Sequence, residues 1–182
     1  PVPPHLLEFL EPGDTLLLYD GRLLLKALLP SANSCSCQIL RGGLLQPRKS
    51  IAIQGKEIPS PVLTKEDMEN LSMAKDCSVT SVMLPFVRRK EDLSTLRKVL
   101  HDLDASQIRI LAKIETLSGV DALDSILPEA DELVIARGDL GNCQPLWKLP
   151  ALQKHIATLC RKHGKPFMVV TQLLASMEQQ SI

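Results

Sequence analysis

After Thr64 the chain alternates short, mainly apolar runs with longer segments in which apolar residues recur every three or four positions. Short apolar runs are typical of parallel strands buried on both faces, and the recurring stripes are typical of helices that cover such strands. The runs begin at intervals of roughly 25 to 35 residues, the usual size of a strand-helix unit. The pattern predicts an α/β fold in which four such units form half of a (β/α)8 TIM barrel. The predicted strands are residues 79–84, 108–114, 133–136 and 167–170.

The helices expected between these strands carry boundary signals. Thr64 is a favourable N-cap, and Asp67 three residues later makes a weaker form of the capping box. Pro150 suits the first helical position, and Gly164 suits the position just past a helix end. The helices are predicted to begin at or near Thr64, Glu91, Ser118 and Pro150.

The first 60 residues have the pattern of a small, turn-rich β unit. Asp20-Gly21 suits a type I′ hairpin turn, and the prolines near residues 58–61 indicate a linker. We therefore expect a β-rich domain at residues 1–60 and a partial TIM-barrel domain at residues 61–182. The strands predicted for the first domain are 15–19, 22–25, 37–40 and 51–53.

Charge and composition exclude several functions. Lysine plus arginine (21) balance aspartate plus glutamate (21), and aromatic residues make up only 3% of the chain, so we expect no nucleic-acid binding. No apolar run reaches the about 18 residues of a membrane span, and no signal peptide is recognisable. We therefore expect no membrane association and a cytoplasmic location. Because the chain opens at Pro1 without methionine and stops in mid-pattern, we also expect a fragment or a truncated product.

The five cysteines are an odd number in apolar surroundings, which favours reduced, buried thiols over a disulfide framework. Cys35 and Cys37 form the only close pair in the sequence. They lack a second Cys or His pair at zinc spacing, so the pattern does not predict a zinc site.

Charged residues lie at the carboxyl ends of two predicted strands, where α/β sheets and barrels build their sites. Lys113 and Glu115 are two residues apart on one strand, so their side chains point to the same side. A lysine there suits a phosphate or a developing oxyanion. The plain alternative is a surface lysine-glutamate pair.

Asp139 follows the next strand, between Gly138 and Gly141. These glycines suit a tight turn whose N–H groups approach an anion, although an ordinary strand-to-loop turn has the same pattern. Glu115 and Asp139 together would make an oxygen-only site for Mg²⁺ or Mn²⁺.

Thr171 directly follows the last predicted strand. Its hydroxyl could hydrogen-bond a substrate or relay a proton, and it could also cap a following helix. The two interpretations are compatible.

Three segments together resemble the motifs of pyruvate kinase, in the same order and at similar spacing. They read KIE at 113–115, ARGDLG at 136–141 and KPFMVVTQLLASM at 165–177. Weaker similarity extends back through Arg88-Arg89 and the loop containing Lys49, so the resemblance covers nearly the whole chain.

The resemblance implies phosphoryl transfer from phosphoenolpyruvate to ADP, a step of glycolysis. By resemblance, Lys113 would stabilise the transferred phosphoryl group, and Glu115 and Asp139 would hold Mg²⁺. The N–H groups of Gly138 and Asp139 would receive the substrate carboxylate, and Thr171 would lie beside the enolate that is protonated. Such a reaction needs mainly positioning and positive charge.

The resemblance also implies that the first 60 residues are the end of a lid domain, in which Lys49 reaches the nucleotide. A K⁺ ion is implied as well, although most of its ligands would lie outside this chain. The open edges of half a barrel would suit association with another copy or with a full-length kinase subunit.

The chain departs from the family pattern at several positions. Pro85 stands where the family has serine, Asn142-Cys143-Gln144 replaces Ile-Glu-Ile, and Ala175 replaces an acid. By the same resemblance the chain lacks the opening strands and the last strand of the barrel, so we expect it to be inactive as an isolated fragment. Two alternatives stay open: a non-enzymatic relative that acts by binding a partner, and a metal-dependent enolate lyase on a related barrel.

Overall fold

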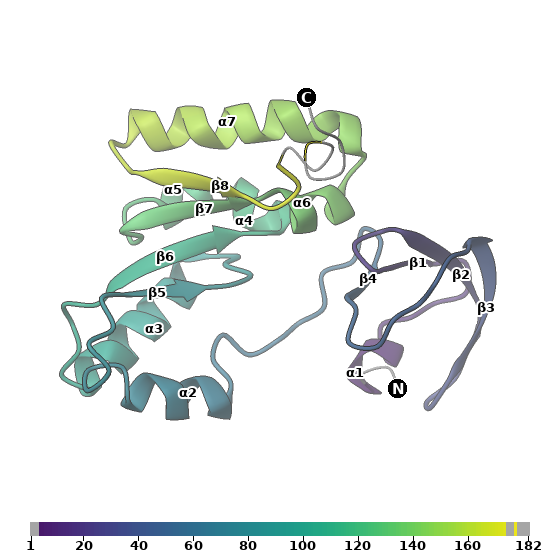
Figure 1. The fold of residues 1–182 in the computed structure, drawn as a ribbon, viewed down its shortest axis with the longest axis horizontal. Helices are drawn as coiled ribbons and strands as arrows, with labels where there is room; N and C mark the ends of the chain where they lie inside the picture. Colours follow the sequence, from purple (N-terminus) through teal and green to yellow (C-terminus); the bar gives the residue numbers. More distant parts are fainter. Residues whose placement is uncertain (1–3, 174–176, 178–182) are drawn as a thin grey trace. The chain divides into compact units, whose positions relative to one another are not determined.

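The computed structural model describes residues 4–173 and residue 177. The chain divides into two compact units (Figure 1). The first comprises the chain up to Pro59 together with Gly141–Leu146, and the second comprises Ser60–Leu140 and the chain from Trp147 onward. The inclusion of Gly141–Leu146 in the first unit is a feature that the sequence pattern did not predict.

The first unit contains a four-stranded antiparallel sheet with the order β3-β2-β1-β4. A small core of Leu6, Leu10, Leu16, Ala27 and Ile53 packs against it. The elements are α1 (Pro4–Leu7), β1 (Thr15–Leu18), β2 (Leu23–Pro30), β3 (Cys35–Arg41) and β4 (Ile51–Ile53).

The predicted hairpin is present between β1 and β2. Asp20 and Gly21 have φ values of 53° and 75°, which a type I′ turn requires at both central positions. The turn is closed by the N–H of Arg22, which donates to the carbonyl of Tyr19 at 3.1 Å. β2 is longer than predicted and runs on to Pro30, because β3 pairs along most of its length.

The second unit is built on four parallel strands in the order β5-β6-β7-β8 (Figure 1). The chain is therefore a mixed α/β protein with a parallel sheet, as predicted. Each predicted strand is present within two residues of its expected bounds: β5 (Ser81–Leu84), β6 (Arg109–Ile114), β7 (Glu132–Ala136) and β8 (Phe167–Val170).

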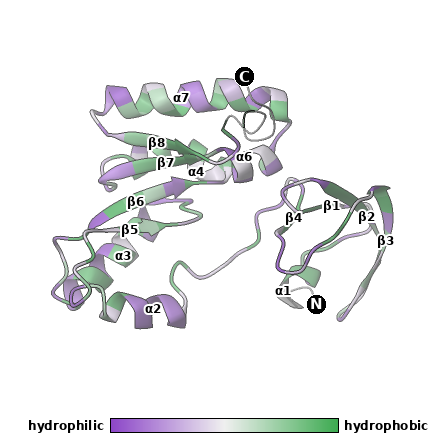
Figure 2. Ribbon diagram, in the orientation of Figure 1, coloured by the Kyte–Doolittle hydropathy of each residue, from purple (hydrophilic) through white to green (hydrophobic). Residues whose placement is uncertain are grey.

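Helices follow the strands of this sheet. Figure 2 shows hydrophobic and hydrophilic residues alternating along α7, as expected for a helix with one face on a core. None of the helices described is long and apolar enough to cross a membrane. They are α2 (Lys65–Ser72), α3 (Lys90–Asp102), α4 (Leu117–Asp121), α5 (Leu123–Ile126), α6 (Arg137–Cys143), the 3-10 turn η1 (Leu146–Lys148) and α7 (Leu149–Lys162).

The predicted capping box at the start of α2 is confirmed. The N–H of Asp67 donates to Thr64 Oγ1 at 3.1 Å, and the N–H of Thr64 donates to Asp67 Oδ2 at 2.7 Å. The end of α7 is also confirmed, because His163 is its C-cap and Gly164 adopts a φ of 63°.

Two helix predictions are wrong in detail. The helix expected to start at Ser118 begins at Leu117, because the Thr116 hydroxyl caps it by accepting from the N–H of Gly119 at 3.1 Å. It breaks at Ala122 into α4 and α5. Pro150 is the second residue of α7 rather than the first.

The two faces of the parallel sheet differ in what they contact. On β6, Ile110, Ala112 and Ile114 point into the main core, which also holds the buried residues of α3, α5 and α7. Leu111 and Lys113 alternate with them and therefore lie on the opposite face. Lys113 is thus on the side of the sheet away from this helical core.

All five cysteines are free thiols. Cys160 is buried as expected, but Cys77 is exposed, so the expectation of buried thiols is wrong there. Cys77 lies in the turn after α2, where no neighbouring element covers it.

Candidate active site

Lys113 and Glu115 meet at the carboxyl end of β6. The Lys113 ammonium lies 2.5 Å from Glu115 Oε1. The Glu115 side chain is only 1% exposed and that of Lys113 is 23% exposed, so this is not the surface pair considered as the alternative. A carboxylate so deeply buried needs its charge compensated, and Lys113 supplies the compensating cation.

The second oxygen of Glu115 is held by the loop that follows β5. Glu115 Oε2 accepts from the N–H of Phe86 at 2.7 Å. Phe86 has a φ of 50°, an uncommon backbone conformation for a bulky residue. In this conformation its N–H donates to the carboxylate. The next N–H, of Val87, donates to the carbonyl of Lys113 at 3.2 Å. The β5 loop therefore fixes both residues of the pair.

Gly119 allows this loop to approach the start of α4. A Cβ atom added at Gly119 would lie 2.3 Å from the carbonyl oxygen of Val87, closer than any real contact. The position accepts only glycine without a backbone shift, and so the packing of Gly119 supports the loop that binds Glu115.

Gly138 and Thr171 connect the ends of β7 and β8. The N–H of Gly138, in the first turn of α6, donates to Thr171 Oγ1 at 2.9 Å. Thr171 directly follows β8 and has a φ of 62°, which is costly for a β-branched residue. Strain of this kind persists only where the surrounding structure holds it, and it concentrates at functional sites.

Asp139 lies in the first turn of α6, half-buried. The alternative of an ordinary strand-to-loop turn does not apply at this point, because the helix begins immediately after the last residue of β7. Asp139 lies just past the carboxyl end of β7, as expected. β7 is the neighbour of β6, because Ile114 of β6 pairs with Ile135 of β7. A helix start also favours nearby negative charge, which stabilises an acid such as Asp139 there.

The donor set at these strand ends fits a hard divalent cation. Within residues 4–173 and residue 177, no group of three His, Cys, Asp or Glu side chains is arranged to hold a metal ion. Mg²⁺ needs fewer, because it commonly uses one or two carboxylates and fills its remaining positions with water and substrate oxygens. Glu115 and Asp139 are two such carboxylates on adjacent strand ends, and each carboxylate oxygen can accept more than one partner.

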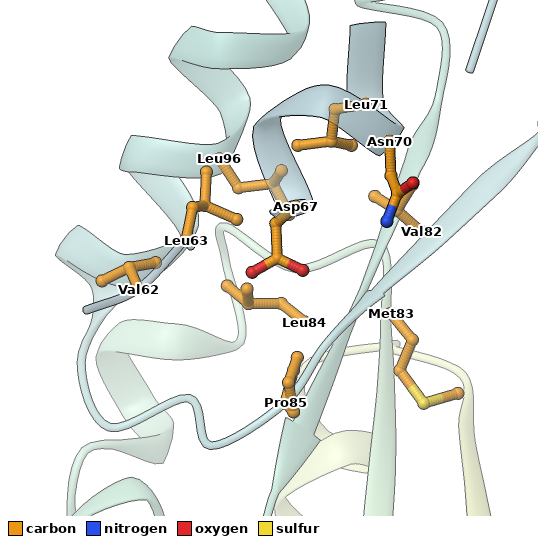
Figure 3. Close-up of a pocket in the computed structure, with 10 residues that line it drawn as sticks. All are labelled: Val62, Leu63, Asp67, Asn70, Leu71, Val82, Met83, Leu84, Pro85 and Leu96. Atoms are coloured by element: carbon orange, nitrogen blue, oxygen red, sulfur yellow. The ribbon is translucent and has the colours of Figure 1, made fainter. Parts of the chain in front are cut away.

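A small pocket lies on the α2 side of β5 (Figure 3). Its volume is about 230 Å³, and its lining is mainly apolar. It includes Pro85 but none of Lys113, Glu115, Asp139 or Thr171, so it is separate from the strand-end cluster. Asp67, which also lines it, is engaged in the cap of α2.

Lys49 lies in the first unit, where its ammonium sits 4.3 Å from the centre of the Tyr19 ring. Arg22 approaches the same ring at 4.6 Å. Two cations sharing one aromatic ring form a local basic patch. This patch lies within the first unit.

The departures from the family pattern have local consequences. Pro85 brings no N–H, but the following Phe86 provides one to Glu115. Asn142 and Cys143 lie in the last turn of α6. Ala175 lies outside the described residues.

The sequence pattern missed Phe86, Val87 and Gly119 as supports of the pair. Gly119, inside a predicted helix, was the one available signal, because an isolated glycine in a helix often marks a close backbone approach. Nothing in the sequence indicated the left-handed conformation of Phe86.

The family model and the similar proteins that match this chain point to the same family. The family model described as pyruvate kinase, barrel domain, matches residues 3–182. Pyruvate kinase of Aeropyrum pernix is 35% identical over 175 residues, which are 96% of this chain and 38% of that protein. Pyruvate kinase of Corynebacterium efficiens is 33% identical over 171 residues, covering 94% and 36% of the two chains, and that of Clostridium acetobutylicum is 33% identical over 167 residues, covering 92% and 35%.

The chain therefore spans between a third and two fifths of the length of these relatives. The match extends over both structural units and includes the strand ends that carry Lys113, Glu115, Asp139 and Thr171. This chain belongs to the pyruvate kinase family.

Proposed function

We propose that this chain carries part of a phosphotransferase site that moves a phosphoryl group from phosphoenolpyruvate to ADP, giving pyruvate and ATP. The observation that carries the proposal is the buried Lys113–Glu115 pair at the carboxyl end of β6. A cation fixed beside a buried carboxylate is already placed to interact with negative oxygens, and phosphoryl transfer depends on such fixed charge and positioning.

In this proposal Lys113 is the electrostatic catalyst. Its ammonium is fixed by Glu115 and lies on the sheet face away from the helical core, where a substrate can approach. It would contact the oxygens of the phosphoryl group as that group leaves the enolate oxygen and bonds to the terminal phosphate oxygen of ADP. The Lys113 side chain is partly exposed and its ammonium is held by Glu115, so little rearrangement would be needed for this contact.

Glu115 and Asp139 would hold Mg²⁺ or Mn²⁺. When bound, such an ion neutralises charge on the substrate oxygens and orients them. Glu115 is suited to this role because Phe86 and Lys113 fix the orientation of its carboxylate. A K⁺ ion belongs to the same proposal, with most of its ligands supplied from outside this chain.

Gly138 and Asp139 would receive the substrate carboxylate through their backbone N–H groups at the start of α6. The N–H of Gly138 is already used by Thr171. Carboxylate binding would therefore release the Thr171 hydroxyl from Gly138. The freed hydroxyl would then lie beside the enolate and assist its protonation.

The two units would each be part of a larger domain. The four strand-helix units would be half of a (β/α)8 barrel, and residues 1–60 would be the end of a lid in which Lys49 reaches the nucleotide. Catalysis would require the complete barrel, in the cytoplasm, whether supplied by the same polypeptide or by association with another kinase subunit.

The proposal is tested by substrate binding and turnover together. Calorimetry should detect phosphoenolpyruvate binding to this chain only when Mg²⁺ is present, and a product that contains the complete barrel should also form pyruvate with ADP and K⁺. Lys113→Ala should abolish pyruvate formation in that product. Lys98→Ala, which changes an exposed lysine on α3, serves as the matched control.

Two results would contradict the proposal. One is retained turnover by Lys113→Ala, which would remove the role given to Lys113. The other is phosphoenolpyruvate binding that is independent of Mg²⁺ and unchanged by Glu115→Gln.

A further inference from the structure

Two thiols meet on the edge strand of the first unit. Cys35 and Cys37 alternate with exposed Ser36 on β3, so they lie on the same face of the strand. Both are half-buried and pack against the small core of that unit. Their Sγ atoms are 3.6 Å apart, with the thiol of Cys37 donating to the sulfur of Cys35.

The strand geometry disfavours a direct disulfide between them. Alternate residues of a strand are about 6.6 Å apart along its axis, from a rise of about 3.3 Å per residue. A disulfide requires its two Cβ atoms at about 3.8 Å. β3 would have to leave its pairing with β2, where Cys37 is opposite Ala27 and Cys35 is opposite Pro30.

A bridging metal ion needs no such distortion. Metal–thiolate bonds of about 2.3 Å, the zinc value, place two sulfurs about 4.6 Å apart when the ion lies between them. The sulfurs are already at 3.6 Å, so small side-chain rotations on an intact strand are sufficient. The pair is therefore better arranged to share an ion than to bond directly.

The number of ligands selects the kind of ion. No group of three or more His, Cys, Asp or Glu side chains suitable for a metal occurs in the described part of the chain, so the pair lacks the additional ligands of a tetrahedral zinc site. Soft thiolates select Cu(I), which accepts two sulfurs as a complete ligand set. Leu6 and Leu16 in the core beside the strand are apolar, and the oxygens that contact the thiols are neutral backbone carbonyls, of Ser36 at 3.4 Å from Cys35 Sγ and of Cys35 at 3.7 Å from Cys37 Sγ.

We propose that Cys35 and Cys37 form a two-coordinate site for a soft monovalent metal ion, with Cu(I) as the occupant. Binding replaces two S–H bonds with two S–Cu bonds and releases two protons, and neither copper nor sulfur changes oxidation state. The site lies in the first unit and does not depend on the phosphotransferase proposal.

The test is anaerobic competition for Cu(I) between the reduced chain and a chromophoric Cu(I) chelator such as bathocuproine disulfonate. We expect one Cu(I) per chain. Cys35→Ser and Cys37→Ser should each weaken binding by at least about 100-fold, the scale of the gain from tethering two ligands. Cys77→Ser, at the exposed thiol, should bind like the wild type.

X-ray absorption of the copper-loaded wild-type chain keeps the test independent of how the variants fold. Two sulfur neighbours and no third ligand support the proposal. Three or more ligands, unchanged Cu(I) binding in Cys35→Ser and Cys37→Ser, or Zn²⁺ binding as tight as Cu(I) binding would each overturn it.

Discussion

The ammonium of Lys113 lies 2.5 Å from a Glu115 carboxylate that is only 1% exposed. The pair is placed at the carboxyl end of β6 and is held by a loop that follows β5. A buried acid that is fixed by a neighbouring cation and a backbone N–H is suited to positioning charge.

The Lys113–Glu115 pair should show strong energetic coupling. A double-mutant cycle with Lys113→Met and Glu115→Gln, measured by urea unfolding, should give a coupling energy of about 1 to 3 kcal/mol. Lys113→Met alone should destabilise more than the double variant, because it leaves a buried carboxylate without its cation.

The exposed pair Lys65–Glu69 is the matched control for this cycle. Its charges are 3.9 Å apart and its side chains are 92% and 67% exposed, so its coupling should be no more than about 0.5 kcal/mol. Equal coupling in the two pairs would show that burial of Glu115 adds nothing.

Gly119→Ala should destabilise the second unit by about 3 kcal/mol. The added methyl group meets the backbone carbonyl of Val87 at 2.3 Å, and a backbone atom cannot move aside as a flexible side chain can. Urea unfolding measures the loss. Gly42→Ala is the control, because its added carbon would meet only the Ile39 side chain at 3.5 Å, an ordinary contact. A change below about 0.5 kcal/mol at Gly119 would contradict the close approach.

Thr171→Val should expose the amide of Gly138 to solvent exchange. Valine keeps the branched shape but removes the oxygen that accepts this N–H at 2.9 Å. Amide hydrogen exchange followed by NMR should therefore be faster at Gly138 in Thr171→Val and protected in Thr171→Ser, which keeps the hydroxyl. Equal protection in both variants would show that the hydroxyl does not hold α6.

Asp131 should make the stability of the second unit depend on acid pH. Burial alone would raise the pKa of Asp131, but the N–H of Ile110 at 2.7 Å and the guanidinium of Arg97 at 2.9 Å hold the pKa below its usual value. A lowered folded-state pKa adds stability above the unfolded pKa of about 3.9, and this stability is lost as the pH falls through the folded value.

The measurement is unfolding free energy between pH 7 and pH 2.5. Asp131→Asn should be less stable than the wild type at pH 7 by about 1 to 2 kcal/mol, through weaker hydrogen bonds to Ile110 and Arg97. The difference should shrink toward the acid end. Asp76→Asn, at an exposed residue after α2, should show neither effect. A difference for Asp131→Asn that is constant with pH would contradict the role of its charge.

Local patterns were sufficient for much of the fold. The four strands were predicted because buried parallel strands need apolar residues on both faces, as at Ile110, Leu111 and Ala112. The α2 cap followed from Thr64 and Asp67, whose hydrogen bonds join residues three apart. Features that depend on neighbours in sequence are readable from the sequence.

Predictions failed where neighbours in space decided the outcome. The helix after β6 breaks at Ala122 into α4 and α5, and α6 begins directly at Arg137, where the sequence pattern suited a turn. The apolar periodicity around Val120 and Leu123 is the same for one helix as for two. Packing against other elements decides whether one continuous helix or two short helices form. The spacing of apolar residues along the sequence does not report this packing.

The sequence by itself determined that Lys113 and Glu115 share a face, because side chains two apart on a strand point the same way. The tertiary structure alone decided that Glu115 is buried, that the N–H of Phe86 binds its second oxygen, and that the hydroxyl of Thr171 accepts from Gly138. The two hydrogen bonds each join segments that follow different strands. They form only when parallel pairing brings the ends of those strands to the same edge of the sheet, and no short stretch of sequence contains that information.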